Sequence, residues 1–276
     1  MLTLVAGTGY TGRRVLDLLP VEKSLGLSRS AIETKRRFAL VDFDTLDTLP
    51  ADLPDDYSVL YTCPPDGAVD ERLRRFVAAL PHEPARFVYI STTGVYGNCH
   101  GALVSEETPV NPGSRMSKPR VDAEDFLRTR TDRLVILRVP GIYGPGRLGI
   151  ERLEAGEACL RESEANPGNR IHIDDLVACC VAALSPETPA GVYNVGDGDH
   201  RSATWFAGEV ARQAGLGPPR EISRARAARE FSPMRLAFLA ASRKVDTTKM
   251  RDILGITPMT PEEGIRRSLT AGSAST

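Results

Sequence analysis

The feature that most constrains the fold is a glycine-rich turn that follows the first apolar run of the chain. The run Leu2–Ala6 has the length of a short buried strand, and residues 7–12 read Gly-Thr-Gly-Tyr-Thr-Gly, which matches the pattern G-x-G-x-x-G. A helix pattern follows and stops before Pro20, with apolar positions at Val15, Leu16, Leu18 and Leu19. Strand, turn and helix in this order are typical of a dinucleotide-binding βα unit.

Each glycine of the turn has a physical role in that interpretation. Gly7 permits the tight turn, Gly9 lets the backbone approach a diphosphate, and Gly12 lets the helix pack closely on the strand. The free backbone amides and the positive end of the helix dipole then face the anion. We therefore expect the whole segment to contact a dinucleotide, namely Gly7, Thr8, Gly9, Tyr10, Thr11 and Gly12. The alternative is a glycine-rich turn with a purely structural role.

The segment after the next strand predicts which dinucleotide is bound. An NAD-binding unit usually places an acidic residue about 20 residues after the turn, where it binds the ribose 2′-hydroxyl. The window Leu25–Ser30 contains no acid, and Ser28, Arg29 and Ser30 occupy the place expected for a 2′-phosphate. Residues 35–37 (Lys-Arg-Arg) follow, and arginine is a charged, forked donor that suits a phosphate. The sequence therefore favours NADP over NAD, with a solvated loop arginine as the alternative.

Strand and helix signals alternate along most of the chain. Strands are predicted at residues 2–6, 24–28, 38–43, 59–62, 86–91, 134–139 and 191–195. Helices are predicted at residues 69–80, through an amphipathic pattern, and at 174–184, with an aspartate as its cap. This alternation predicts an α/β protein with a doubly wound, parallel Rossmann sheet.

The alternation fades after residue 197, which predicts a second, smaller part. We expect a nucleotide-binding core at residues 1–198, with an excursion into the substrate lobe around 147–170, and a small C-terminal lobe at 199–276. Residues 220–244 carry six arginines and one lysine, which either grip a phosphate or form a solvated cationic face; we favour the solvated face. A helix is predicted at 247–254, and the tail from Ala271 is expected to be disordered.

Composition excludes several classes of protein. The formal net charge of −1 gives no general attraction to nucleic acid or acidic lipid, and no apolar run approaches the roughly 18 residues of a membrane span. The N-terminus has neither a basic leader nor a cleavage site. Five cysteines without a CxxC pair suggest no disulfide framework and no metal site. We expect a cytoplasmic protein with a small-molecule substrate and no nucleic-acid or membrane partner.

Several segments carry a family resemblance along nearly the whole chain. The stretch Ser91–Gly97 reads STTGVYG, and further matches lie at Leu137–Arg147 (LRVPGIYGPGR), Arg170–Val177 (RIHIDDLV), Val192–Gly198 (VYNVGDG) and Leu254–Leu269 (LGITPMTPEEGIRRSL). The chain resembles the extended short-chain dehydrogenases/reductases of the NAD(P)-dependent epimerase/dehydratase type. It looks most like an atypical subgroup that lacks the active-site tyrosine. The resemblance implies a Rossmann fold, a pyridine nucleotide cofactor and a homodimer.

The resemblance also assigns catalytic roles. The family's Ser/Thr role falls on Thr92, whose hydroxyl would bind the substrate oxygen. The Tyr-x-x-x-Lys motif falls on residues 114–118, with Lys118 present and Ser114 in place of the tyrosine. A phenol with a reference pKa near 10 can be tuned toward neutral pH, whereas a serine alcohol lies several units higher. Pro119 disfavours a helical conformation at Lys118, which places that lysine at the edge of the following helix.

Other residues are candidates for the missing proton donor. Tyr96 and Tyr143 follow strands near the expected nicotinamide site, and we include Tyr143 among the catalytic candidates, with packing as the alternative for both. His172 is interpreted as ordering a loop before the helix. Cys99 and His100 resemble a nucleophile pair only superficially, because adjacent residues rarely face each other. Pro64, after the fourth strand, completes the expected cofactor contacts.

Two functional hypotheses follow. The first is an NADP-dependent oxidoreductase or epimerase/dehydratase-like enzyme that acts on an alcohol or carbonyl, such as that of a nucleotide sugar. The second is a catalytically weak or inactive NADP(H)-binding sensor or scaffold. The loss of the tyrosine favours the second, and the retained Thr92 and Lys118 favour the first, since a missing acid/base group typically costs about 100- to 10,000-fold in rate.

Overall fold

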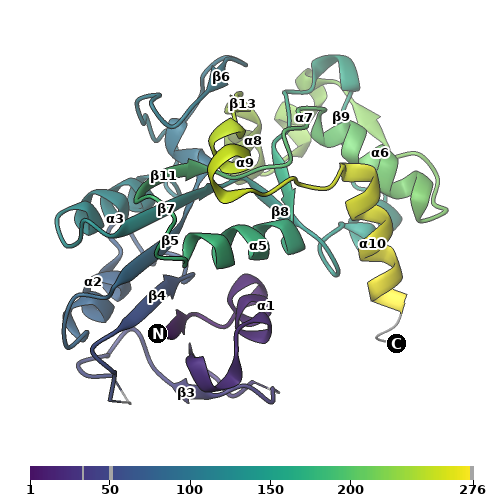
Figure 1. The fold of residues 1–276 in the computed structure, drawn as a ribbon. Coiled ribbons are helices and arrows are strands. Elements are labelled where there is room, and N and C mark those ends of the chain that lie inside the picture. Colours follow the sequence, from purple (N-terminus) through teal and green to yellow (C-terminus); the bar gives the residue numbers. More distant parts are fainter. Residues whose placement is uncertain (33, 50–51, 274–276) are drawn as a thin grey trace.

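A computed structural model describes residues 1–32, 34–49 and 52–273 of the 276. Within this part of the chain, seven parallel strands form a central sheet in the order β11-β7-β5-β4-β1-β2-β3 (Figure 1). These strands are β1 (Leu2–Ala6), β2 (Ser24–Ser28), β3 (Phe38–Leu40), β4 (Tyr57–Tyr61), β5 (Arg86–Thr92), β7 (Leu134–Val139) and β11 (Gly191–Asn194). The strand order reverses between β1 and β4, which is the point where doubly wound sheets bind their ligands.

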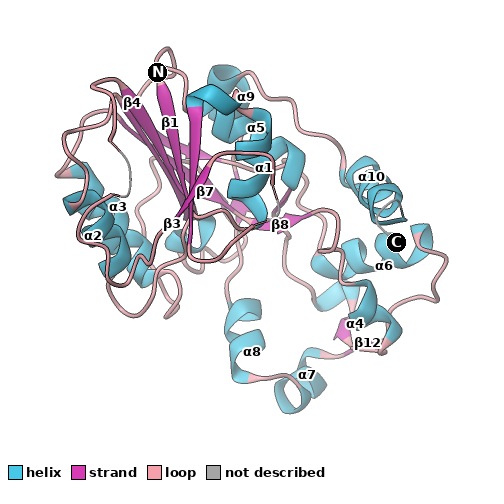
Figure 2. Ribbon diagram, turned by 90° about the horizontal axis from the view of Figure 1, so that it is seen from below, coloured by secondary structure: helices cyan, strands magenta, loops and turns pink. Residues whose placement is uncertain are grey.

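Helices cover both faces of this sheet (Figure 2). One face packs against α1 (Tyr10–Leu18), α5 (Ile173–Ala183) and α9 (Thr248–Leu254). The other face packs against α2 (Glu71–Ala78) and α3 (Lys118–Arg128). The predicted α/β fold with a doubly wound parallel sheet is therefore confirmed.

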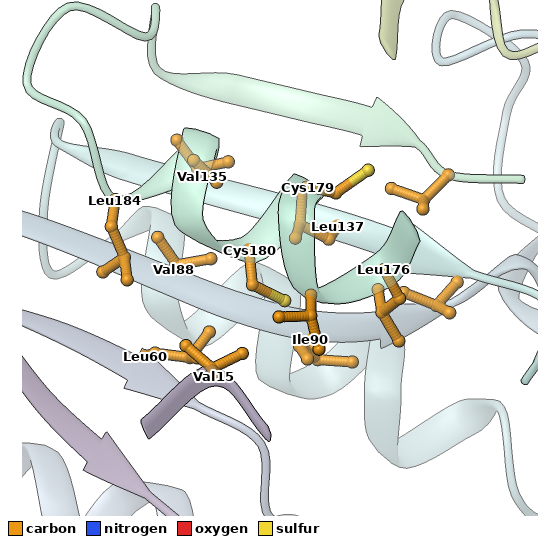
Figure 3. Close-up of a cluster of buried hydrophobic side chains, with 14 of the residues drawn as sticks. Val15, Leu60, Val88, Ile90, Val135, Leu137, Leu176, Cys179, Cys180 and Leu184 are labelled. Atoms are coloured by element: carbon orange, nitrogen blue, oxygen red, sulfur yellow. The ribbon is translucent and has the colours of Figure 1, made fainter. Parts of the chain in front are cut away.

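The two apolar clusters explain why the strands read as nearly continuous apolar runs. In β5, Val88 and Ile90 point to the face covered by α1 and α5, whereas Phe87 and Tyr89 point to the opposite face. A strand that is buried on both faces needs apolar residues at every position. Figure 3 shows the first cluster, in which Leu176, Cys179 and Cys180 of α5 contact the side chains of the strands beneath.

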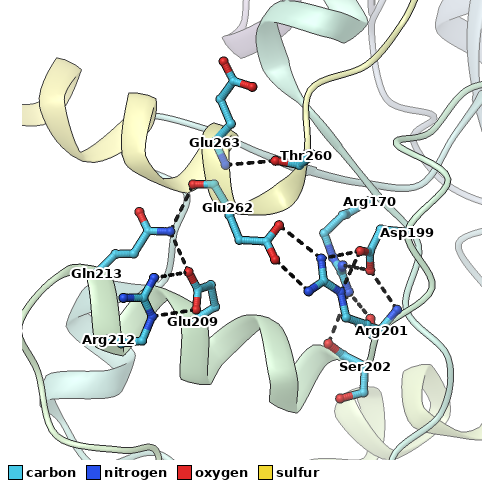
Figure 4. A network of polar contacts seen from close by, with 10 residues as sticks. All are labelled: Arg170, Asp199, Arg201, Ser202, Glu209, Arg212, Gln213, Thr260, Glu262 and Glu263. Carbon is cyan, nitrogen blue, oxygen red and sulfur yellow. Dashed lines mark hydrogen bonds and ion pairs between the residues drawn. The ribbon is translucent and has the colours of Figure 1, made fainter.

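Smaller elements form the C-terminal lobe, which we define as α4, β9, α6, β12, α7, α8 and α10. Their bounds are α4 (Ile150–Glu154), β9 (Cys159–Leu160), α6 (Ala203–Gln213), β12 (Glu221–Ile222), α7 (Arg224–Glu230), α8 (Pro233–Ala240) and α10 (Pro261–Ser273). Parallel pairing of β9 with β12 joins residues about 60 positions apart. A network of charged and polar side chains connects α6, α10 and the turn before α6, through Arg201, Glu262 and Gln213 (Figure 4).

Short elements connect this lobe to the sheet. Strand β8 (Gly141–Tyr143) pairs with β10 (Arg170–His172), and β6 (Leu103–Val104) pairs with β13 (Lys244–Val245). Three 3-10 turns complete the described elements, at η1 (Val21–Lys23), η2 (Thr93–Tyr96) and η3 (Glu162–Glu164). After β13 the chain returns to the sheet, where α9 adds Met250 and Leu254 to the core. The division of the chain at residue 198 stays a prediction.

Most strand predictions agree with the structure, and three details are wrong. Strand β3 ends at Leu40, because Val41 and Phe43 are buried as part of a loop instead of a strand. Helix α5 begins at Ile173 and is capped by His172, whose ring nitrogen accepts the Asp174 amide at 3.2 Å, so no aspartate caps it. The expected disordered tail is helical through Ser273 as part of α10, and residues 274–276 lie outside the described residues.

Among the described residues, none of the helices combines the length and apolar character needed to cross a bilayer. The same part of the chain contains no group of three or more metal-ligating side chains arranged around a common point. The five cysteines are unpaired. Burial raises the pKa of Cys63 and of Cys179 to about 12, so neither thiol provides a thiolate at neutral pH.

Candidate active site

The turn between β1 and α1 is closed by contacts that only glycines allow. Gly7 has a φ of +91°, and its amide donates to the Leu27 carbonyl at 3.0 Å. Thr62 donates its hydroxyl to the Gly7 carbonyl at 2.7 Å, which fixes the turn to the end of β4. A Cβ added at Gly12 would collide with the same Gly7 carbonyl oxygen. Gly7 and Gly12 are therefore required by the fold itself.

Gly9 differs from these two glycines because the space beside its Cα is open. A Cβ built at Gly9 would meet no heavy atom within 4 Å among the described residues. Gly9 directly precedes α1, and within the described chain no side chain caps the first turn of this helix and no acidic residue lies in it. The N-terminus of α1 therefore combines free backbone amides, the positive end of the helix dipole and open space beside Gly9. A bound diphosphate would require all three of these features.

Two arginines flank the same end of α1. The ring of Tyr10 lies between Arg14 and Arg147, whose guanidinium carbons are 4.0 and 3.9 Å from the ring centroid. The Tyr10 hydroxyl donates to the Pro145 carbonyl at 3.0 Å, which fixes the loop after β8 beside the turn. Positive side chains beside the N-terminus of a helix repel its dipole, and a bound anion would compensate them. No sequence pattern predicts this pair, because Arg14 and Arg147 are distant along the chain.

The residues expected to bind a 2′-phosphate lie at the end of β2. The Ser28 hydroxyl donates to the Ser30 carbonyl at 2.7 Å, and Arg29 between them is exposed. Arg29 lies near Asp44; a hydrogen bond from Arg72, and to a smaller extent the charge of Arg29, hold the pKa of Asp44 below its ordinary value. Asp44 already pairs with Arg72, which leaves the Arg29 guanidinium available for another anion.

Pro64 and the basic segment at residues 35–37 have different surroundings. Pro64 is exposed, and the sulfur of the preceding Cys63 lies next to Gly7 of the turn. Arg36 donates to the Leu19 carbonyl at 2.9 Å and so binds the end of α1. The structure thus brings Gly7–Gly12, Ser28–Ser30 and Pro64 to the carboxyl ends of neighbouring strands, and their contacts with a cofactor stay predictions.

Thr92 is the last residue of β5 and lies at the same edge of the sheet. Its Oγ1 accepts the Gly94 amide at 3.1 Å, which leaves the hydroxyl proton free to be donated to a ligand. A Cβ added at Gly94 would lie 3.3 Å from Thr92 Oγ1 and 3.6 Å from Ser117 Cβ. The end of β5 and the turn before α3 are therefore adjacent, as the family resemblance implies for residues 114–118.

The turn at residues 114–118 is ordered by its own serines. Ser114 Oγ and Ser117 Oγ are 2.8 Å apart, and the Ser117 amide donates to Ser114 Oγ at 3.1 Å. The Lys118 amide donates to the Ser114 carbonyl at 3.2 Å, so Lys118 is the first residue of α3 with Pro119 directly after it. The side chain of Lys118 is exposed and forms no hydrogen bond or ion pair with the described residues. Pro119 therefore does not remove Lys118 from the helix.

A buried ion pair fixes α3 against the sheet. Glu124 of α3 binds Arg138 of β7 with an Nη2–Oε2 distance of 2.7 Å, and both side chains are buried. Ser91 donates to the same carboxylate at 2.5 Å. Tyr96 accepts from Arg138 at 3.0 Å and donates to Asn194 at 2.7 Å, so its hydroxyl is occupied within this network. Tyr96 is a packing residue, and the pair positions the helix that carries Lys118.

The surroundings of Tyr143 disfavour it as a proton donor, although its role stays a prediction. Tyr143 is 3% exposed, and its ring contacts His172 and Phe206 at centroid distances of 5.2 and 5.1 Å. A Cβ at Gly264 of α10 would collide with the Tyr143 ring, so this helix closes over it. Burial raises the pKa of Tyr143 well above its ordinary value. His172 is fully buried between Asp174 and Ser268, which agrees with an ordering role.

Cys99 and His100 do not form a nucleophile pair. The Cys99 thiol lies 3.5 Å from the Tyr96 carbonyl oxygen, and the backbone amide of Cys99 donates to the Ser242 carbonyl at 2.9 Å. His100 has a φ of +54° and exposes its side chain away from the core. The loop that contains both residues is tied to the segment before β13, a contact that no sequence pattern indicated.

Arg120 is a further residue that sequence reasoning missed. Its Nη1 donates to the Ile90 carbonyl at 2.7 Å and to the Tyr89 hydroxyl at 3.0 Å. Arg120 thus lies over the carboxyl end of β5, close to the edge where Thr92 ends the strand. Its position two residues after Lys118 was the one available signal.

Comparisons with known proteins agree with this geometry. Residues 71–196 match the model of the NAD-dependent epimerase/dehydratase family. Protein YeeZ of Escherichia coli is 32% identical over 144 residues, which are 51% of this chain and 51% of YeeZ, so the match spans about half of that relative. A UDP-glucose 4-epimerase of Mycolicibacterium smegmatis is 28% identical over 201 residues, covering 67% of this chain and 61% of the epimerase.

Solved structures share the fold along the whole chain. A conserved protein of unknown function from Silicibacter pomeroyi superposes with a TM-score of 0.81 at 25% identity, covering 100% of both chains. MoeE5, solved with UDP-glucose and NAD, has a TM-score of 0.78 at 20% identity and covers 100% of this chain and 99% of its own. Human SDR39U1, solved with NADPH, has a TM-score of 0.75 at 20% identity and covers 98% and 99%. Relatives of this fold thus include structures with NAD and with NADPH.

Proposed function

We propose that the chain, whose residues 71–196 match the NAD-dependent epimerase/dehydratase family model, is an NADP-dependent enzyme of that family acting on an alcohol or carbonyl. The observation that carries the proposal is the open space at Gly9, beside the uncapped and acid-free start of α1. Gly7 and Gly12 are explained by packing, but packing does not explain Gly9. A diphosphate that approaches the backbone does.

The preference for NADP rests on Arg29. Its guanidinium is exposed at the end of β2, in a segment without an acidic residue to accept a ribose 2′-hydroxyl. Arginine binds a phosphate through a forked, charged donor set. We therefore expect NADPH to bind more tightly than NADH, with Arg14 and Arg147 adding attraction for the diphosphate.

The reaction would take place beside Thr92 and Lys118. When bound, the nicotinamide cofactor supplies hydride transfer to or from a substrate carbon. Thr92 donates its free hydroxyl proton to the substrate oxygen, because its Oγ1 already accepts the Gly94 amide. Lys118 provides an unpaired positive charge at the start of α3, where it can bind ribose hydroxyls. A water molecule supplies or accepts the proton that a tyrosine at position 114 would otherwise handle.

Titration of the full chain with NADPH and NADH tests the cofactor assignment. We expect Gly9→Ala to leave the melting temperature unchanged, because its Cβ has space, and to weaken NADPH binding by about tenfold or more, because the Cβ fills the diphosphate approach. Gly208→Ala is the matched control, since a Cβ there also has open space but lies in α6. Tighter binding of NADH than NADPH would overturn the NADP assignment.

A second function, an NADP(H)-binding sensor without turnover, is favoured by one observation. Ser114 Oγ is bound to Ser117 and the Tyr96 hydroxyl to Asn194. The Tyr143 hydroxyl has no hydrogen-bond partner in the described chain, but this side chain is only 3% exposed, so neither phenol is accessible to a substrate. Turnover measured with a panel of carbonyls and nucleotide sugars separates the two functions. Ser114→Tyr sharpens the test. A gain of activity would mean that the rest of the site is competent for catalysis. If the variant binds NADPH normally but gains no activity, the sensor is favoured.

A further inference from the structure

An open surface cavity of about 350 Å³ lies between the loop after η2 and the C-terminal lobe, and the side chains of Arg224 and His100 in its wall are exposed. Its lining residues are Asn98, His100, Asn166, Arg224, Leu239, Ala240 and Ser242. They come from four segments that are far apart along the sequence, so the cavity exists only in the folded chain. Its volume falls in the range of small-molecule sites, about 300–1,000 Å³.

The lining has a clear chemical character. Within the described part of the chain, the cavity is lined by one guanidinium, one imidazole, two amides and a hydroxyl, and by no carboxylate. These groups donate hydrogen bonds, and the guanidinium donates them with a full positive charge. A site of this composition repels cations and suits an oxyanion, either a carboxylate or a phosphate.

Arg224 differs from Arg226 and Arg235, two other arginines of residues 220–244. Arg226 pairs with Glu230 on α7, and Arg235 reaches Glu157 at 3.7 Å, so both have carboxylate partners. Arg224 instead donates from Nη2 to the Glu164 carbonyl at 2.5 Å and to Asn166 Oδ1 at 3.3 Å. These neutral acceptors orient the guanidinium at the cavity. In the described chain it forms no ion pair, and the nearby Glu164 carboxylate accepts the Arg224 backbone amide at 3.0 Å. Some arginines of this stretch thus form ion pairs with glutamates at the surface, whereas Arg224 lines the cavity.

His100 is held at the cavity by a strained backbone. Its φ of +54° is unusual for a residue with a side chain, and such strain costs of order 1 kcal/mol and tends to be kept at functional sites. The Asn98 side-chain oxygen accepts both the His100 amide and the Ser242 amide at 3.1 Å. The same loop begins at the 3-10 turn η2, which Thr92 caps. The cavity and the expected reaction site are therefore connected by one short, ordered segment.

We propose that this cavity binds an oxyanion of the substrate, a carboxylate or a phosphate, through Arg224 and His100. The substrate of the enzyme is accordingly a small organic acid or phosphate ester, whose reacting alcohol or carbonyl lies toward Thr92. This inference rests on the proposed function and adds the substrate class to it.

Calorimetric titration of the full chain, saturated with NADPH, tests the proposal with three matched probes. Glucose is neutral, glucuronate adds a carboxylate, and glucose 1-phosphate adds a phosphate. We expect at least one of the two anions to bind and glucose to bind more weakly by about tenfold or more, since a charge-assisted hydrogen bond is lost. Whichever anion binds more tightly identifies the source of the oxyanion.

Variants assign that binding to the cavity. Arg224→Gln removes the charge. It is expected to weaken the binding of the anion by about tenfold or more, to the affinity measured for glucose. Arg229→Gln is the control, because this arginine is exposed on the same helix and does not line the cavity. His100→Asn removes the imidazole and keeps a residue type that tolerates a positive φ. This variant should weaken the binding of the anion by a smaller factor than Arg224→Gln does.

The outcomes separate the two proposals. If the wild-type chain binds no pyridine nucleotide, the proposed function fails whatever the sugars do. If NADPH binds normally and neither anion binds better than glucose, or Arg224→Gln binds them as tightly as Arg229→Gln, the cavity is not an oxyanion site. NADPH affinity should be equal in all three variants, which also shows that each of them is folded.

Discussion

In the nucleotide-binding half of the molecule, α5 presents Leu176, Cys179 and Cys180 to equally apolar strands, whereas in the C-terminal lobe α6 and α10 share only a small apolar cluster and are also joined by charged side chains. Arg201 binds Asp199 at 2.5 Å and Glu262 at 2.7 Å, and its side chain is 40% exposed. Apolar burial is not directional, but the interior is closely packed, so the core tolerates neither a polar replacement nor a large change of side-chain volume. The lobe depends on particular pairs, and each pair can change without unfolding the sheet.

The largest effect is expected at the glycine that joins the first strand to its helix. Gly12→Ala places a Cβ against the Gly7 carbonyl, and because backbone atoms would have to move, we expect the free energy of unfolding to fall by about 4 kcal/mol or more. Chemical denaturation measures this. Gly9→Ala is the control and should unfold like the wild-type chain. Equal stability of the two variants would contradict the close packing of Gly12.

The apolar core should respond next. Leu176→Ala removes a fully buried side chain of α5 and is expected to lower the free energy of unfolding by about 3 kcal/mol, from lost burial and the cavity left behind. Val181→Ala on the same helix, at a position 36% exposed, should change it by about 0.5 kcal/mol or less. A similar loss in both variants would mean that α5 does not cover the sheet as described.

A pH dependence is expected at the turn that joins the two regions. Burial raises the pKa of Asp197 to about 7, with Arg170, Asp199 and Asp175 as charged neighbours. The folded chain therefore holds a proton that the unfolded chain releases near pH 4, so the stability from this group is lost as the pH rises from about 4 to about 7. Asp197→Asn cannot titrate and should lose less stability than the wild-type chain between pH 5 and pH 8, by up to about 3 kcal/mol.

Melting temperatures of the wild-type chain and Asp197→Asn at pH 5 and pH 8 measure this difference. Burial also raises the pKa of Asp175 to about 6, and that group remains in both proteins, so it cancels in the comparison. Parallel curves for the two proteins would show that Asp197 ionises normally in the folded chain.

The smallest effect is expected in the polar network of the lobe. Arg201→Gln breaks ion pairs with Asp199 and Glu262 that are half exposed, and should cost about 1 kcal/mol or less at low salt. Added salt should reduce the difference, because it screens the wild-type pairs. Arg212→Gln removes a more exposed pair within α6 and should have no measurable effect. A loss that is insensitive to salt would indicate that Arg201 acts through packing on Trp205 instead.

The same contrast explains how much of the molecule the sequence predicts. Leu2–Ala6, Ser24–Ser28 and Leu134–Val139 are strands with the predicted bounds, because parallel strands buried on both faces leave an unmistakable apolar run. The bounds of β3 were too long, since Val41 and Phe43 are buried in a loop, and burial alone does not identify a strand.

The lobe and the site were less accessible to sequence reasoning. Helices α7 and α8 lie in an arginine-rich stretch without a clear apolar period, and α10 continues through residues expected to be disordered. The turn glycines, Thr92 and Lys118 could be placed from their motifs, and the structure brings them to one edge of the sheet. The cavity at Arg224 and the ion pair of Glu124 with Arg138 arise only from tertiary contacts, so no local pattern reveals them.

The path of the chain has a consequence for how proteins of this architecture diverge. The polypeptide leaves the central sheet after β7, returns for β11, leaves again for α6 to α8, and returns once more for α9, which packs on the sheet. The C-terminal lobe is built from several segments that alternate along the chain with elements of the sheet. It cannot be exchanged between relatives as one continuous segment, because such a segment would also contain a strand of the sheet or a helix that packs on it. New substrate specificity is therefore expected to arise through substitutions of individual side chains in the segments that form the lobe.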